Sequence, residues 1–474
     1  MDQVIRVGLF GIGLSTYWGQ FEGLLPRLEG YQRRIGERIA QQQVQVVNAG
    51  MVDTIEKAHE AASLFRREEV SLVFLYVSTY ALSATVLPVV QQLQKPVVVL
   101  NLQPDNAIDY TWFNQLGDRG MMTGEWLANC QACAVPEIAN VFRRAGIAFH
   151  PVTGTLNDEE AWSEVSDWIA AAWVARGMAV NRVGVMGHYY NGMLDIYSDL
   201  TTQSAVFGSY IQHLEMCDLK ALRDTVTPEE ISQKVAQIRL EFEVMPDCDE
   251  TEVLRAARTA VALDKLVTQF RLGSLCYYYE GTPDGEYEDI IASVIAGNSM
   301  LTAHNVPVAG EYEIKNVQAM KIMDLFGAGG SFTEFYGMDF NDGIVLMGHD
   351  GPGHLAIAEG RPLLKPLGVY HGKPGKGLSV EMQVKHGKVT LLSVVEDKDA
   401  GLRLLVAEGE SVPGPILQIG NTNSRYRFSL GVKEFVNRWS SEGPAHHCAI
   451  GIGHIAGKLE KLGALLQIPV VRIC

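Results

Sequence analysis

Short apolar, β-branched runs alternate with amphipathic stretches at the start of the chain, and this rhythm restricts the fold more than any other feature of the sequence. The runs have the length and composition of strands that are buried on both faces. They occupy residues 4–13, 44–50, 71–78 and 96–102. Helical patterns lie between them, and we expect Asp53 and Glu56 to form a capping box at the start of the second helix. The alternation predicts a parallel, doubly wound sheet with helices on both faces.

A second alternating unit begins near residue 155, with a helical pattern at 157–177 and strand-like runs at 182–187 and 274–281. After about residue 330, alternating strands joined by glycine-containing turns predict an antiparallel sheet or barrel, and 453–474 form a closing αβ unit. The predicted fold class is therefore α/β, with two parallel doubly wound α/β domains followed by a C-terminal, mainly antiparallel β-barrel-like domain. The expected domain ranges are 1–155, 156–325 and 326–474.

The charge balance narrows the classes of ligand. A chain of 474 residues is too long for one core, and its net charge of -16 argues against nucleic acid and anionic membranes, which need a basic face. A small neutral or metal-chelated ligand fits better. The first ten residues enter a strand without a signal-like segment, and no stretch offers 18 uncharged apolar residues, so we expect a cytoplasmic protein.

A CxxC motif and a pair of glycines resemble a zinc site and a dinucleotide-binding loop, but the surrounding sequence favours neither function. Cys130 and Cys133 form a CxxC, but it lies in a helical-looking segment and no second CxxC completes a zinc site, so we expect buried, reduced structural cysteines. Gly11 and Gly13 resemble the start of a dinucleotide fingerprint. Thr16 takes the third small position, and this argues against NAD.

The stretch 308–354 carries the strongest chemical signal. Glu311, Glu334 and His349 each stand beside glycine or at the edge of an apolar run, and His447 follows in a glycine-rich segment near the C-terminus. Carboxylates and imidazoles beside glycine are the components of divalent-metal sites and acid/base pairs. These residues are far apart in sequence, so their spacing alone does not show that they meet. The alternative to a shared metal site is that the histidines form ordinary hydrogen bonds in loops and the carboxylates lie on the surface.

The order and spacing of these motifs resemble those of the L-arabinose isomerase family and, more distantly, L-fucose isomerase. The resemblance is carried by GE before a helix ending in MKIM, then GGSFTEFY, a strand ending in MGH, and GPAHH. It implies that Glu311, Glu334, His349 and His447 bind a divalent cation, usually manganese. It also implies that Glu311 and Glu334 are the acid/base pair of an aldose-ketose isomerase and that the chain forms a hexamer or trimer with active sites at subunit interfaces.

Such an isomerase moves a proton between adjacent carbons through an enediol, which requires two carboxylates and a cation to stabilise the developing charge. His446 is expected to orient or contact the substrate, whereas His354 is expected to be a structural loop histidine. Met193 and Tyr279, at predicted strand ends, are further candidate substrate contacts, although aromatic residues there are more often core.

Two loops depart from the family pattern and place the substrate in doubt. Where L-arabinose isomerases have Gln-His in the first βα loop, this chain has Ser15 and Thr16. A later motif keeps Gln115 but has Asp118 in place of a sugar-contacting His. The substrate is therefore expected to be a sugar or sugar derivative other than L-arabinose. The alternatives are a metal-dependent epimerase or lyase acting on a sugar acid, and a non-catalytic sugar-binding sensor.

Two arginines add a further candidate contact. Arg425 and Arg427, in GNTNSRYRF, could recognise a carboxylate or phosphate through their guanidinium forks. A surface or interface salt bridge is the more ordinary role for such residues.

Overall fold

The computed structural model describes every residue except 1–3, 94, 281, 283, 284, 371, 372, 375 and 400. The chain divides into two compact units, Met1–Arg176 and Gly177–Cys474. The second unit contains both a parallel sheet and a barrel, and its division near residue 325 stays a prediction.

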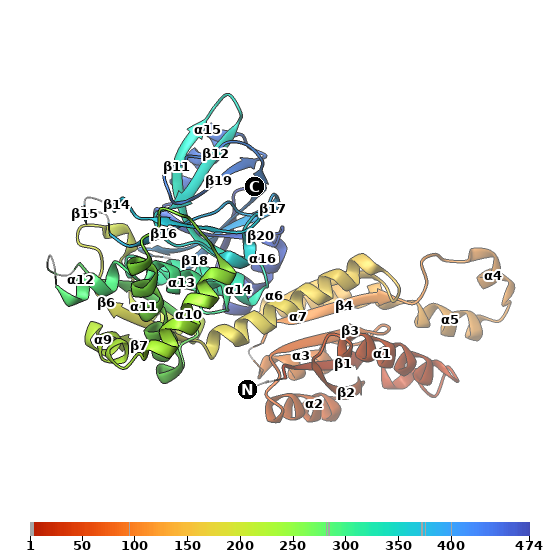
Figure 1. Ribbon diagram of the computed structural model, residues 1–474. Helices are drawn as coiled ribbons and strands as arrows, with labels where there is room; N and C mark the ends of the chain where they lie inside the picture. The colour runs from red at the N-terminus through yellow and green to blue at the C-terminus, as the bar shows by residue number, and fades with distance from the viewer. Residues whose placement is uncertain are drawn as a thin grey trace. The chain divides into compact units, whose positions relative to one another are not determined.

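The first unit is built on a five-stranded parallel sheet of order β2-β1-β3-β4-β5 (Figure 1). Its strands are β1 (Arg6–Ile12), β2 (Gln45–Val52), β3 (Leu72–Val77), β4 (Val97–Gln103) and β5 (Phe149–Thr155). Leu9 and Phe10 are consecutive residues of β1 and face helices on opposite sides of the sheet. Leu9 packs against Gly36 of α1 (Leu24–Ala40), where an added Cβ would contact it. The ring of Phe10 lies 6.1 Å from that of Phe65 in α2 (Ile55–Arg67). This alternation confirms a sheet covered on both faces.

The four predicted strands are confirmed, and the sheet has a fifth that the sequence did not reveal. In β5 the segment FHPVTGT contains Pro151 and Gly154, which weaken the strand signal. β5 pairs only with β4 among the described strands, so it is an edge strand, where proline is tolerated.

The helices of the first unit cover the sheet and extend from it. They are α1 (Leu24–Ala40), α2 (Ile55–Arg67), α3 (Ser83–Gln91), α4 (Tyr110–Gln115), α5 (Arg119–Ala128), α6 (Val135–Ala145) and α7 (Glu159–Ala179), which ends in the second unit. The predicted capping box is wrong: Thr54 caps α2 by accepting a hydrogen bond from the Lys57 amide, and Asp53 accepts one from the Trp18 indole instead.

The structure also corrects the prediction for the CxxC. Cys130 and Cys133 form a disulfide, so they are not reduced thiols, and only Cys130 is buried. The continuous helix expected there is wrong as well, because a 3-10 turn, Gln131–Cys133, separates α5 from α6. The buried Gln131 amide donates to the carbonyl groups of Ser78 and Ala128, which pins this turn to the end of β3.

The second unit begins with a four-stranded parallel sheet of order β10-β9-β6-β7. Its strands are β6 (Arg182–Gly187), β7 (Tyr210–Leu214), β9 (Ser274–Tyr278) and β10 (Val308–Ala309). The helices associated with it are α8 (Leu200–Phe207), α9 (Met216–Asp224), α10 (Pro228–Glu241), α11 (Glu250–Phe270), α12 (Glu286–Ile291) and α13 (Ile295–Ala303). The predicted α/β character of this segment is confirmed.

A closed antiparallel barrel of six strands follows, in the order β17-β20-β11-β12-β19-β18, and pairing of β17 with β18 closes it. Its strands are β11 (Gly329–Asp339), β12 (Ile344–His349), β17 (Gly387–Asp397), β18 (Gly401–Val412), β19 (Thr422–Phe428) and β20 (His447–Ile452). The helix α15 (Val432–Ser441) precedes β20. The closing unit, α16 (Ala456–Leu466) and β21 (Val470–Arg472), adds a parallel strand to β18. The barrel-like prediction is confirmed.

Short strands complete this unit: β8 (Glu243–Val244), β13 (Leu363–Pro366) and β16 (Leu378–Glu381) form a small sheet, and β14 (Val369–Tyr370) pairs with β15 (Lys373–Pro374). The helix α14 (Ile314–Leu325) joins the parallel sheet to the barrel, because it contacts β9 and β10 as well as β11, β17 and β20. Ten of its residues are buried, including residues on every side of the helix. The segment before it is therefore fixed between the sheet and the barrel.

None of the helices in the described part of the chain combines the length and the apolar character that a bilayer span requires.

Candidate metal centre and adjoining pocket

A left-handed turn between β10 and α14 presents two carboxylates. Glu311 and Tyr312 have φ angles of 57° and 63°, a conformation that residues other than glycine seldom adopt. The turn is held by two hydrogen bonds, from the Tyr312 amide to the Tyr277 carbonyl at 3.0 Å and from the Glu313 amide to the Gly310 carbonyl at 3.0 Å. Uncommon backbone geometry that neighbouring elements hold in place is frequent at functional sites.

The barrel brings the other candidate ligands together. Glu334 in β11 pairs with Gly348 of β12 on one side and with His447 of β20 on the other. His349 is the last residue of β12, directly after Gly348. Phe332, two residues before Glu334 in β11, packs its ring 4.3 Å from the rings of both His349 and His447. Three adjacent strands therefore place these side chains in one region.

The nitrogen and oxygen atoms of this cluster converge. His447 Nε2 lies 3.3 Å from His349 Nε2 and 3.5 Å from Glu311 Oε2, and His446 Nε2 lies 3.7 Å from the same oxygen. Ligand atoms of Glu311, His446 and His447 all lie within 4.8 Å of one another. Donors bound to one ion at about 2.1 Å are about 3.0–3.4 Å apart, so the observed spacings suit a shared cation.

The environment of the Glu311 carboxylate also suits a bound cation. Its Oε2 is buried and has no hydrogen-bond partner among the described residues. Burial raises the pKa of Glu311 to about 7; the nearby His446 opposes this, and the carboxylates of Glu313 and Glu334 reinforce it. A cation placed among these groups would satisfy the orphaned oxygen and offset the repulsion between the carboxylates.

Two carboxylates that the sequence did not single out orient the paired histidines. Glu313 Oε2 lies 2.5 Å from His447 Nδ1, and Asp195 Oδ2 lies 2.6 Å from His446 Nδ1 and 3.0 Å from the His446 amide nitrogen. Each imidazole therefore has its Nδ1 held and its Nε2 directed toward Glu311. Carboxylates that fix the second nitrogen of a metal-binding histidine are a recurrent feature of metal sites.

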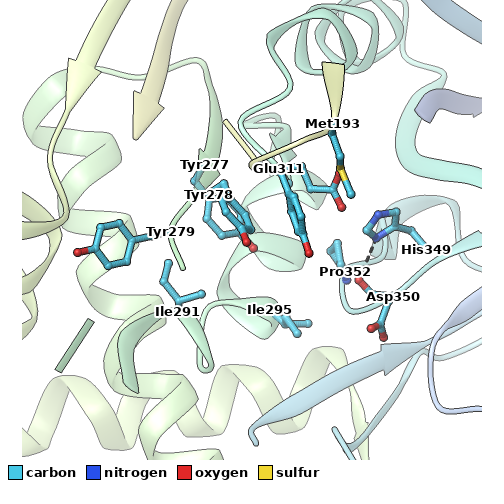
Figure 2. Close-up of a pocket in the computed structure, with 12 residues that line it drawn as sticks. Met193, Tyr277, Tyr278, Tyr279, Ile291, Ile295, Glu311, His349, Asp350 and Pro352 are labelled. Carbon is cyan, nitrogen blue, oxygen red and sulfur yellow. Dashed lines mark hydrogen bonds between the residues drawn. The ribbon is translucent and has the colours of Figure 1, made fainter. Parts of the chain in front are cut away.

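A cavity of ≈ 70 Å³ adjoins the cluster and is shown in Figure 2. Glu311, His349 and Asp350 contribute its polar lining, and Met193 is a further lining residue. Aromatic and aliphatic side chains form most of the remainder: Tyr190, Tyr277, Tyr278, Tyr279, Ile291, Ile295 and Pro352. The structure thus places the candidate contacts Met193 and Tyr279 at the same pocket as two of the candidate metal ligands.

The remaining predicted substrate contacts lie in the first unit. Ser15, Thr16, Gln115 and Asp118 are exposed, and their role in substrate binding stays a prediction. Asp118 has a structural task as the N-cap of α5, where it accepts a hydrogen bond from the Met121 amide at 2.8 Å.

The structure also places the two candidate arginines and His354. Arg425 is buried and forms an ion pair with Asp342, which is the more ordinary of the two roles expected for it. Arg427 is exposed. His354 is buried, with neither ring nitrogen hydrogen-bonded within the described part of the chain. Burial lowers the pKa of His354 to about 4, which keeps the ring neutral.

Sequence comparisons agree with the geometry. Residues 329–469 match the family model of the L-arabinose isomerase C-terminal domain, the segment that contains Glu334, His349 and His447. The chain is also 21% identical over 391 residues to an L-arabinose isomerase from Aeromonas salmonicida (strain A449), a match that covers 79% of this chain and 75% of that protein. Both comparisons support the resemblance to the L-arabinose isomerase family that the motifs predicted, with this chain as a divergent relative.

Proposed function

We propose that this protein is a metal-dependent aldose-ketose isomerase acting on a sugar other than L-arabinose. The observation that carries the proposal is the convergence of Glu311, His349 and His447 within 3.3–3.5 Å contacts, beside Glu334 and at the edge of a small cavity. Similarity to the L-arabinose isomerase family supports the reaction class.

In this proposal Glu311, Glu334, His349 and His447 hold a divalent cation such as Mn²⁺. A bound cation supplies positive charge that stabilises negative charge developing on the substrate oxygens. Oxygen and imidazole ligands suit manganese, and Glu313 keeps the Nε2 of His447 turned toward Glu311.

Glu311 and Glu334 transfer the protons. The aldose loses a proton from C2 and gains one at C1, and the hydroxyl proton of O2 passes to O1. The reaction therefore needs neither an oxidant nor a reductant.

We further propose that the chain forms a homo-oligomer. In the first unit, α4 and α5 extend away from the sheet (Figure 1) and expose large apolar side chains. Ile108, Tyr110, Trp112, Met121 and Trp126 are between 49% and 68% exposed. A group of this size on one segment is typical of an interaction surface.

A substrate screen tests the function. Purified protein supplied with Mn²⁺ is incubated with tetroses, pentoses, hexoses and sugar acids, and ketose formation is followed by NMR. We expect at least one aldose to be converted, with loss of conversion on chelation and in Glu334→Gln. The matched variant Glu410→Gln, at an exposed position of β18, should retain activity. Conversion of only a sugar acid by epimerisation or elimination would favour the alternative reaction classes.

A further inference from the structure

The disulfide between Cys130 and Cys133 lies where a projecting segment of the first unit joins the sheet. It spans the 3-10 turn that links α5 (Arg119–Ala128) to α6 (Val135–Ala145). The two cysteines differ in access, because Cys130 is 3% exposed whereas Cys133 is an exposed residue. A reagent in solution can therefore reach the bond from the Cys133 side.

The turn and α6 are anchored to the sheet by contacts other than the disulfide. The Gln131 side chain is fully buried and donates to the carbonyl groups of Ser78 and Ala128, both at 2.9 Å. In the first turn of α6, the Glu137 carboxylate accepts a hydrogen bond from the Ser83 amide at 2.8 Å. These contacts should hold α6 in place whether or not the two sulfur atoms are joined.

The helix on the other side of the disulfide is held less firmly. Leu127 and Ala128, its last two residues, are the buried residues of α5, and the helix extends away from the sheet with α4 (Figure 1). Glu125 forms an ion pair with Arg27 in α1, but both side chains are partly exposed, and such pairs contribute little. The cross-link at Cys130 thus reinforces the end at which α5 is attached, and its loss should let α5 open more often.

Exchange at this bond balances with a dithiol as the reductant. One thiolate of the dithiol attacks Cys133 Sγ, the sulfur–sulfur bond breaks, and Cys130 leaves as a thiolate that takes up a proton. The second thiolate of the dithiol then attacks its own sulfur in the mixed disulfide, which releases Cys133 and forms the oxidised dithiol. Two electrons pass to the protein, and two cysteine thiols result. The reverse exchange with an oxidised dithiol restores the bond.

We propose that Cys130 and Cys133 form a reversible redox switch, opened by a dithiol reductant at Cys133, that sets how firmly α5 is held to the sheet. Exposed disulfides are the readily reduced ones and often serve in regulation, and burial of Cys130 directs attack to the other sulfur. Reduction should also loosen the apolar surface of α4 and α5 that is proposed above to mediate self-association. That consequence rests on the proposed homo-oligomer, whereas the switch itself does not.

The first test asks whether the bond opens in the folded protein. Oxidised full-length protein is treated with dithiothreitol, with or without urea, quenched in acid and alkylated after unfolding, and peptide masses are measured. We expect Cys130 and Cys133 to be alkylated even in the sample reduced without urea. A bond that dithiothreitol opens only in urea is a structural cross-link and overturns the proposal.

Single variants test which sulfur is attacked. Glutathione disulfide should modify Cys133 in folded Cys130→Ser, and it should modify Cys130 in folded Cys133→Ser at least about 10-fold more slowly, because Cys130 is buried. Equal rates of modification in the two variants, measured by intact mass, contradict attack at Cys133.

Hydrogen exchange measures the consequence for α5. Exchange at residues 119–128, followed by mass spectrometry, should be at least about 10-fold faster in the reduced than in the oxidised protein, with a smaller change at 135–145. The Cys130→Ser/Cys133→Ser variant should match the reduced state in either buffer. Cys217→Ser, which removes an exposed free thiol, should respond to reduction as wild type does. Equal exchange at 119–128 in the two redox states overturns the proposal.

Light scattering on the same samples separates the switch from the proposed homo-oligomer. A smaller assembly on reduction supports both. A monomer in both redox states contradicts the homo-oligomer alone, and a difference in α5 exchange then still supports the switch. An assembly that loosens on reduction without any change in α5 exchange contradicts the switch and leaves the homo-oligomer supported.

Discussion

His447 Nδ1 lies 2.5 Å from Glu313 Oε2, and both side chains are buried where the turn before α14 meets the first residue of β20. The contact joins residues 134 positions apart and, by engaging Nδ1, fixes the orientation of the imidazole ring. His447 therefore directs Nε2 toward His349 and Glu311.

Glu313→Gln should weaken the binding of Mn²⁺ by about 10–100-fold, because the amide holds the imidazole less strongly and removes a negative charge from behind it. Isothermal titration of the purified variant measures this. Glu410→Gln serves as the control, since that side chain is exposed. Unchanged affinity in a folded Glu313→Gln variant would mean that the contact is structural.

Asp195→Asn should loosen the segment 188–199. Its carboxylate accepts hydrogen bonds at His446 Nδ1 and at the His446 amide, and so holds this loop to the start of β20. We expect faster hydrogen exchange in 188–199, measured by mass spectrometry on the metal-free protein. Leu194→Ala, at a position that is 74% exposed, should leave exchange unchanged. Equal exchange in wild type and Asp195→Asn would contradict this role.

His354 should make the protein less stable in mild acid. Its pKa is lowered from 6.5 to about 4 by burial, so between these values the unfolded chain takes up a proton that the folded protein does not. The free energy of unfolding should therefore fall by about 1.4 kcal/mol per pH unit as the pH drops from 6.5 toward 4, with no contribution above that window. Urea unfolding across this range should show a shallower slope for His354→Gln than for wild type or for His213→Gln, at an exposed position.

The apolar surface of α4 and α5 should mediate self-association. Replacing Trp112 and Trp126 together with lysine places two charges on this surface, so we expect light scattering to report a smaller assembly than for wild type. Leu240→Lys, at a position that is 77% exposed in the second unit, is the matched control. A wild-type monomer, or an assembly indifferent to the double variant, would rule out this surface.

The sequence predicted the parallel sheets because buried strands leave continuous apolar runs, as in Leu72–Val77, where every residue is buried. It did not reveal β5, whose edge position tolerates proline and glycine. The capping of α2 also escaped prediction, because Asp53 and Thr54 both suit an N-cap and only the tertiary contact of Asp53 with Trp18 distinguishes them.

The candidate metal ligands could be predicted because a family motif surrounds each of them, whereas the groups that orient the histidines could not. Glu313 is two residues from Glu311, but its direction depends on the left-handed conformation of the intervening turn. Asp195 is 251 residues from His446, and no periodic pattern links them. The substrate pocket likewise depends on packing between β9, α12 and the turn at Gly310, which no single stretch of sequence encodes.

Metal titration of the intact, chelator-treated protein tests the central claim most directly. Wild type should bind about one Mn²⁺ per chain, and a folded His349→Gln/His447→Gln variant should bind none at the same concentrations, because Nε2 atoms 3.3 Å apart are removed from the cluster. Wild-type protein that takes up no divalent ion, or a double variant that retains full stoichiometry, would contradict the metal centre.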